Sequence, residues 1–162
     1  MSKRKASKKV VILDIDHTVS DAAWRDDMIG AAGFTWDDYH KEAPKDKPIE
    51  EMVRLVYCLR HEFHIIAVTA RPEKWRGITM AWLVNQGVMF HELIMRPDKD
   101  YSSAAALKVK LVKERIGDDL RSQVAFVLDD RDDVMAAFRA EGVTCLQVQA
   151  QMTIRAKAEE AA

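Results

Sequence analysis

Short apolar runs alternate with longer amphipathic segments along most of the chain. The runs are rich in β-branched side chains and show little polar alternation, which is typical of parallel strands covered on both faces. They predict strands over residues 10–15, 65–69, 92–95, 124–128 and 143–148. Between the runs, apolar positions recur at helical spacing and predict helices over residues 49–63, 75–82, 107–116 and 134–138. Pro48 suits the first turn of the first helix, and Gly87, Gly117 and Gly142 follow the other three as C-caps.

This alternation of strands and helices predicts an α/β fold, a three-layer α/β/α arrangement with a central parallel sheet. In such sheets, ligands bind at the carboxyl ends of the strands, near the point where the strand order reverses. Asp14 and Asp16 lie where the first strand ends. We therefore expect both carboxylates at the mouth of a crevice, because an ionised acid inside the core would be costly.

Other polar residues follow the later strands of the same predicted sheet. The second strand leads into Thr69 and Arg71, and the fourth leads into Asp129 and Asp130. Lys108 stands near the start of the third helix. If the sheet is parallel, all of these side chains meet at one edge.

Lys108 differs from its neighbouring lysines in the side of the helix that it occupies. At about 100° per residue, an apolar arc is formed by Leu107, Leu111, Val112 and Ile116. Lys108 falls within this arc, whereas Lys110 and Lys113 project from the opposite side. An inward lysine beside carboxylates favours a functional role over a snorkelling one.

The four aspartates would repel one another at one sheet edge without a compensating charge. Mg²⁺ offers that compensation, since it binds carboxylates together with water and phosphate oxygens. Lys108 and Arg71 add positive charge for an anionic group, and Thr69 adds a hydroxyl donor. The sequence therefore predicts a site for phosphate together with Mg²⁺.

Composition and charge bound the kind of protein. The 162 residues, 48% hydrophobic and 31% charged, fit one soluble domain. There is neither an apolar stretch of membrane-spanning length nor the apolar block of a signal peptide, so we expect a cytoplasmic protein without membrane association. Cys58 and Cys145 are interpreted as small core residues.

The formal charge of −1 is unevenly distributed. Residues 1–9 hold five Lys or Arg and no acid, so they carry +5 and the rest of the chain carries −1 − 5 = −6. A short basic arm is equally compatible with steering toward nucleic acid and with a solvated terminus. The expected organisation is a flexible arm over 1–9, a domain over 10–150 and a tail over 151–162.

The motif "DIDHT" at 14–18, Thr69, the inward Lys108 and the paired Asp129 and Asp130 occur in the order of the haloacid-dehalogenase-like (HAD) phosphohydrolase motifs. The chain resembles, more closely, the 3′-phosphatase domain of phage polynucleotide kinase/phosphatase. The likeness extends over about residues 10–149 and is best in "VTAR", "LDDR" and "AEGVTCLQV".

The resemblance implies a HAD-like fold and an aspartyl-phosphate mechanism. Asp14 would be the nucleophile, Asp16 the general acid and base, and Thr69 and Lys108 would hold the phosphoryl oxygens. Arg25, at a spacing where that family has a functional arginine, and Arg71 would bind substrate. Mg²⁺ would be held by Asp14, by the backbone carbonyl of Asp16, and by one or both of Asp129 and Asp130.

Two positions depart from the family. His17 stands where glycine is usual, and we interpret it as a turn residue; Ala104 stands where an acid can occur. The ATP-binding motif of the kinase half does not occur in the sequence.

Between residues 21 and 46 there is room only for a short flap, so a minimal, capless form is expected. Trp24 and Trp36 lie in this flap, where packing is favoured over stacking on a base.

An open site suits a large substrate, and three functions follow in order of preference. The first is Mg²⁺-dependent removal of a terminal phosphate, preferably 3′, from DNA or RNA ends. The second is hydrolysis of mononucleotides or other small phosphate monoesters. The third is a non-catalytic phosphate-binding module.

Overall fold

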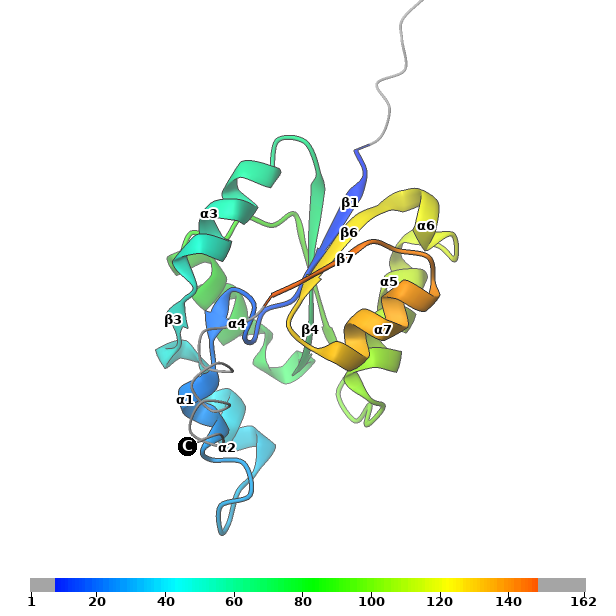
Figure 1. Ribbon diagram of the computed structural model, residues 1–162. Coiled ribbons are helices and arrows are strands. Elements are labelled where there is room, and N and C mark those ends of the chain that lie inside the picture. The colour runs from blue at the N-terminus through cyan, green and yellow to red at the C-terminus, as the bar shows by residue number, and fades with distance from the viewer. Residues whose placement is uncertain (1–7, 149–162) are drawn as a thin grey trace, which may run out of the picture.

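The computed structural model describes residues 8–148. Most of the predicted basic arm and the whole predicted tail lie outside this range. The five predicted strands all form and make one parallel sheet in the order β5-β4-β1-β6-β7 (Figure 1). They are β1 Val10–Leu13, β4 His64–Pro72, β5 Glu92–Arg96, β6 Val124–Asp129 and β7 Cys145–Gln147.

The central strand β1 shows why the sheet needs cover on both faces. All four of its residues are buried, and their side chains alternate between the two sides. Val11 and Leu13 join the core under one group of helices, while Val10 and Ile12 join the core under the other. The continuous apolar run of the sequence is thus explained by a strand that packs on both faces.

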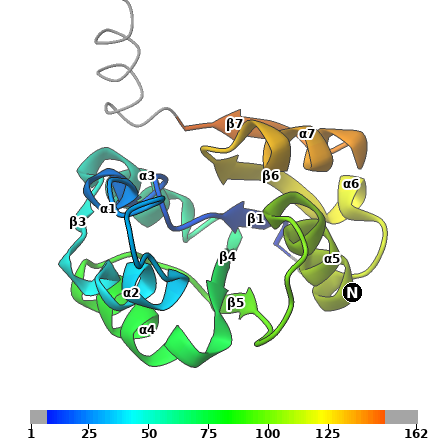
Figure 2. The ribbon, with the colours of Figure 1, turned by 90° about the horizontal axis from the view of Figure 1, so that it is seen from below.

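Helices cover the two faces of the sheet in separate groups (Figure 2). On one side lie α3 Glu50–Leu59 and α4 Arg76–Asn85, which follows the short helix η2 Glu73–Trp75. On the other side lie α5 Ala104–Ile116, α6 Leu120–Gln123 and α7 Asp132–Ala140. The three-layer α/β/α prediction is confirmed. Gly117 and Gly142, with φ values of 95° and 73°, follow α5 and α7 as expected of C-caps.

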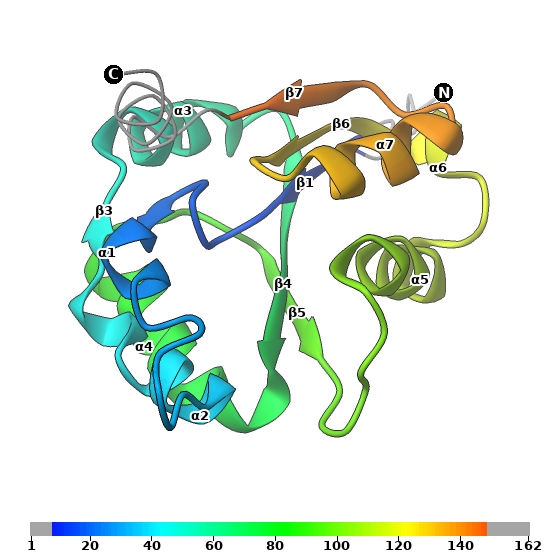
Figure 3. The ribbon, with the colours of Figure 1, turned by 60° about the horizontal axis from the view of Figure 1, so that its bottom comes forward.

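The segment between β1 and α3 forms the flap, residues 22–46, beside the carboxyl ends of β1 and β4 (Figure 3). It contains α1 Ala23–Asp26, α2 Trp36–Lys41 and η1 Ala43–Lys45. The strands β2 Ser20–Asp21 and β3 Lys47–Pro48 pair antiparallel at its base. Pro48 therefore lies in a strand and not in a helix, because the next backbone N–H, that of Ile49, donates to the Val19 carbonyl at 2.8 Å.

The prediction for the cysteines is wrong for Cys58, which is exposed, while Cys145 is half-buried; both are free thiols. Val56 is the buried residue of α3, and Cys58 lies about 200° further round that helix. Among the described residues, no helix is long and apolar enough to cross a membrane.

Candidate active site

Asp14 directly follows β1 at the point where the strand order reverses, since the chain moves from β1 outward through β4 and β5 and later returns to β6 on the other side. Its backbone N–H donates to the carbonyl of Leu128 on β6 at 2.9 Å, so the sheet itself fixes its position. The side chain is buried, with Thr18 Oγ1 donating to Asp14 Oδ2 at 3.3 Å. Asp14 therefore lies at the carboxyl end of the first strand, as predicted.

Lys108 reaches this carboxylate from α5. Its Nζ donates to Asp14 Oδ1 at 2.5 Å and to Asp129 Oδ2 at 2.7 Å, and its side chain is 3% exposed. Both carboxylates raise the pKa of Lys108 against the opposing effect of burial. The inward orientation inferred from helical spacing is therefore correct.

Asp129 and Asp130 lie at the end of β6, and α7 begins two residues beyond them. Carboxylate oxygens of Asp14, Asp129 and Asp130 lie within 4.8 Å of one another. One oxygen of Asp130, Oδ1, is buried without a hydrogen-bond partner. A hard cation would supply that partner, so these residues fit a divalent metal ion.

The electrostatics of the cluster also favour an added cation. Burial raises the pKa of Asp14, and the charge of Asp129 raises it further against the effect of Lys108. Burial and Asp129 likewise raise the pKa of Asp130 to about 6. One lysine thus leaves the acids incompletely neutralised.

Thr69 belongs to the same edge of the sheet. Leu13 pairs with Ala67 in the parallel register, which places Thr69 beside the chain that leaves β1. Its side chain is buried, and its Oγ1 accepts a hydrogen bond from the backbone N–H of Arg71 at 3.2 Å.

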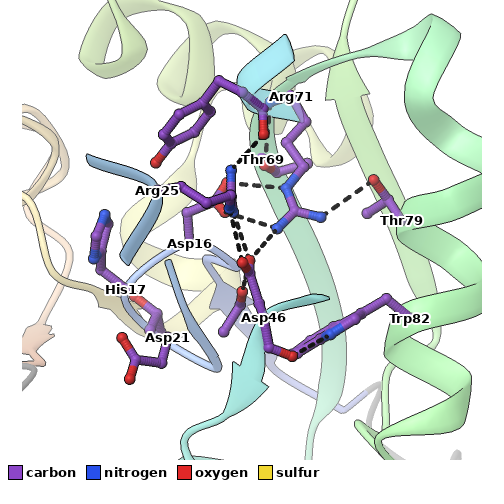
Figure 4. A network of polar contacts seen from close by, with 12 residues as sticks. Asp16, His17, Asp21, Arg25, Asp46, Thr69, Arg71, Thr79 and Trp82 are labelled. Carbon is purple, nitrogen blue, oxygen red and sulfur yellow. Dashed lines mark hydrogen bonds and ion pairs between the residues drawn. The ribbon is translucent and has the colours of Figure 1, made fainter. Parts of the chain in front are cut away.

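Asp16 lies next to this cluster but belongs to a different network (Figure 4). Its Oδ1 accepts from Nη2 of Arg25 and from Nη2 of Arg71, both at 2.7 Å, and its Oδ2 accepts from Arg71 Nε at 3.0 Å. Burial would raise the pKa of Asp16, but Arg71 and Arg25 together lower it well below its usual range. Asp16 is therefore an ionised carboxylate in this state of the protein.

Asp46 contacts the same two arginines, Arg25 and Arg71, that bind Asp16. It is 3% exposed, and its carboxylate accepts from Arg25 Nε at 2.7 Å and from Ser20 Oγ at 2.5 Å, with Arg71 Nη2 at 3.6 Å. Sequence reasoning missed this residue. It stands in the charge-rich stretch "PKDKP", where nothing in the spacing separates it from the exposed acids of the flap.

His17 accounts for one departure from the family pattern. Its φ is 60°, in the left-handed region that favours glycine, and its backbone N–H donates to Ser20 O at 2.7 Å. Its ring pairs with Asp26 at 3.2 Å, which raises the His17 pKa to about 9 against the effect of burial. The predicted turn role agrees with this geometry.

The comparisons with known proteins agree with this arrangement. Residues 8–152 match the family model of the phosphatase domain of polynucleotide kinase PNKP. None of the curated proteins matches the chain.

The solved structures that share the fold include the following three. Two Pnkp1/Rnl/Hen1 complexes, one described as an RNA repair complex, align with TM-scores of 0.70 and 0.72 at 24% and 23% identity over 91% of this chain. This chain spans 48% and 44% of those proteins. A HAD family enzyme from Bacteroides thetaiotaomicron, solved with magnesium and inorganic phosphate, aligns at 11% identity and TM-score 0.58, over 89% of this chain and 95% of its own.

Two aspartates follow the first strand of this parallel sheet, next to a lysine and two further aspartates. Together with the family match, this arrangement identifies a HAD-like phosphoric monoester hydrolase. Within that class, the chain belongs to the PNKP phosphatase domain family.

Proposed function

We propose that this domain is a Mg²⁺-dependent phosphatase that removes the 3′-terminal phosphate from nucleic-acid ends through an aspartyl-phosphate. One observation carries the proposal: Asp14 is buried at the sheet edge, held by Lys108, with Asp16 in a separate network next to it. Two neighbouring carboxylates in different environments suit two different roles in one reaction.

The reaction divides into two displacements. In the first, a carboxylate oxygen of Asp14 attacks phosphorus, the bond between phosphorus and the ester oxygen breaks, and Asp16 gives the leaving oxygen its proton. In the second, Asp16 takes a proton from water and the water oxygen attacks phosphorus. The bond between phosphorus and the Asp14 carboxylate oxygen breaks, which releases inorganic phosphate. Lys108 and Thr69 hold the phosphoryl oxygens, whose charge they stabilise.

Asp16 needs a proton before the first displacement, although Arg25 and Arg71 keep it ionised in the free protein. An incoming anionic phosphate raises the pKa of a neighbouring carboxyl, because like charges disfavour ionisation. Substrate binding thus favours the acid form. The additional role of Arg25 and Arg71 in holding substrate stays a prediction, since their described hydrogen bonds go mainly to Asp16 and Asp46.

The metal would be held by the carboxylates of Asp14, Asp129 and Asp130, with the backbone carbonyl of Asp16 as a further predicted ligand. When bound, Mg²⁺ reduces the repulsion between the anionic nucleophile and the anionic phosphate. A HAD family neighbour holds magnesium together with phosphate, which supports this choice of ion.

The family and the shape of the molecule support a nucleic-acid end as substrate. The matching family model is the phosphatase domain of a polynucleotide kinase, and two structural neighbours occur in Pnkp1/Rnl/Hen1 complexes, one of them an RNA repair complex. The flap is short, and residues 8–148 contain no separate cap domain over the sheet edge. Such a site can admit a chain end.

The substrate is tested with four compounds at equal concentration: a 3′-phosphorylated DNA oligonucleotide, its RNA counterpart, the 5′-phosphorylated isomer and a mononucleotide. We expect the 3′-phosphorylated oligonucleotides to be hydrolysed at least about tenfold faster, a difference of about 1.4 kcal/mol in transition-state binding. EDTA should abolish release of phosphate and excess Mg²⁺ should restore it. Faster turnover of the mononucleotide would favour the small-substrate phosphatase instead.

Asp46→Asn tests the link between the arginine network and proton transfer. Loss of one carboxylate charge loosens Arg25 and Arg71, so Asp16 is oriented less well. General acid catalysis matters most for poor leaving groups, so we expect the rate with an alkyl phosphate to fall about tenfold or more, and the rate with p-nitrophenyl phosphate to fall much less. Circular dichroism checks that the variant is folded.

Asp37→Asn is the matched control, because Asp37 also pairs with a basic residue, Lys74, but its side chain is 58% exposed. It should leave both rates unchanged. An equal loss with the two leaving groups in Asp46→Asn would show that Asp46 has no specific effect on proton transfer.

A further inference from the structure

The flap has two exposed tryptophans, for which the sequence favoured packing over stacking on a base. Trp24 is 42% exposed and Trp36 is 57% exposed, whereas Trp82 of α4 is buried at 4%. Tryptophan gains most of its stabilising energy from burial, so two large exposed rings on one short segment call for an explanation.

Trp36 is exposed but held in a defined orientation. Its ring meets those of Phe34 and Tyr39 edge-to-face at centroid distances of 5.2 and 5.5 Å. It also stacks on His40 at 6.2 Å with an angle of 28° between the ring planes. Three neighbouring rings thus support the indole, which lowers the entropy lost when a ligand stacks on it.

Trp24 is tied directly to the residues around Asp16. Its Nε1 donates to Asp46 Oδ1 at 2.9 Å, and the same oxygen accepts from Arg25 Nε. Arg25 in turn donates to Asp16, the proposed proton donor to the leaving group. The exposed indole therefore lies within two side chains of the point where the leaving nucleoside would be released.

The charges around the flap favour neutral base faces over phosphates. Asp37, next to Trp36, is paired with Lys74, and Asp26, near Trp24, is contacted by His17 and by the hydroxyl of Tyr39. Acidic residues repel a phosphate backbone, but every nucleobase has an uncharged face that stacks on an indole.

We propose that Trp24 and Trp36 form a stacking surface for the terminal nucleobases of a single-stranded nucleic acid whose 3′-phosphate lies at Asp14. This inference rests on the proposed function and extends it, because it assigns the recognition of bases to the flap. Stacking of this kind tolerates any base sequence, as an end-processing enzyme requires.

Binding is measured in the Asp14→Asn background, so that no substrate is consumed. The probes are a 3′-phosphorylated deoxyadenosine tetranucleotide and an analogue that is abasic at its two terminal positions. Trp36→Ala should weaken binding of the first probe about tenfold and change binding of the abasic probe much less, because only the first probe has terminal bases that stack on the indole. Tyr57→Ala, which removes a ring 52% exposed on α3, is the matched control and should affect neither probe.

Salt dependence separates stacking from charge. The affinity ratio between Trp36→Ala and the parent should stay constant as salt is raised, since salt weakens phosphate contacts and not stacking. Trp24→Ala should also discriminate between the two probes. A loss equal for both probes in both tryptophan variants, or no loss at all, would overturn the proposal.

The two proposals fail in different ways. If the wild-type protein hydrolyses no oligonucleotide, the proposed function fails, whatever the binding shows. If it hydrolyses 3′-phosphorylated ends while both tryptophan variants bind the base-bearing probe as tightly as the parent, only the stacking surface fails.

Discussion

Replacing Asp14 by asparagine should abolish turnover while the domain stays folded. An amide oxygen is too weak a nucleophile to form the phosphoenzyme, and loss of a nucleophile in other enzymes costs on the order of 10⁴-fold or more in rate. Asparagine keeps the shape of the side chain and an oxygen that can accept from Lys108. It also removes a buried charge that Asp129 repels, so the thermal midpoint should stay the same or rise.

The measurement combines steady-state phosphate release with acid-quenched reactions on a ³²P-labelled substrate. Wild-type protein should carry label on Asp14 during turnover, and the variant should carry none. Asp118→Asn, at an exposed acid away from the cluster, serves as the control and should retain full activity. Persistent turnover in Asp14→Asn would rule out the covalent mechanism.

Replacing Lys108 by methionine should affect stability as well as activity. The variant leaves Asp14 and Asp129 facing each other in a buried site, and breaking one side of a buried ion pair costs about 3 kcal/mol or more. The rate should fall by about 10² or more, because a charged group on the phosphoryl oxygens is lost. Lys110→Met, on the exposed side of the same helix, should change neither quantity.

The stability loss in Lys108→Met should depend on pH. Without the lysine, the pKa of Asp14, already raised in the wild type, rises further. A carboxyl with a raised pKa binds more protons in the folded state, so it favours folding at low pH and loses this contribution as pH rises through the raised value. Urea unfolding should therefore show a larger deficit at pH 8 than at pH 5. An equal deficit at both would mean that the repulsion is not its cause.

The sheet and most of the candidate site could be predicted because local patterns determine them. Apolar runs with β-branched residues identified the strands, and a parallel sheet necessarily brings Asp14, Thr69 and Asp129 to one edge. The place of Lys108 within an apolar arc was sufficient to orient it inward. These inferences needed only periodicity and topology.

The flap could not be predicted in the same way. Its helices are four and six residues long, too short to form without contacts from the rest of the chain. The role of Asp46 depends on its contacts with Arg25 of α1 and Arg71 of β4, which no local pattern encodes. The exposure of Trp24 and Trp36 likewise depends on how the flap meets the sheet.

Sequence changes at the base of the flap and at its tip should have different consequences, because only the base holds the ion network. Because Arg25 of α1 and Arg71 of β4 share Asp16 and Asp46, the flap cannot swing away without parting buried charges. Its tip is different: Gly30 and Gly33 have φ values of 85° and 79° and open space where a side chain would be. Evolution or protein engineering can therefore lengthen and diversify this tip to suit new leaving groups while the proposed active site keeps its shape.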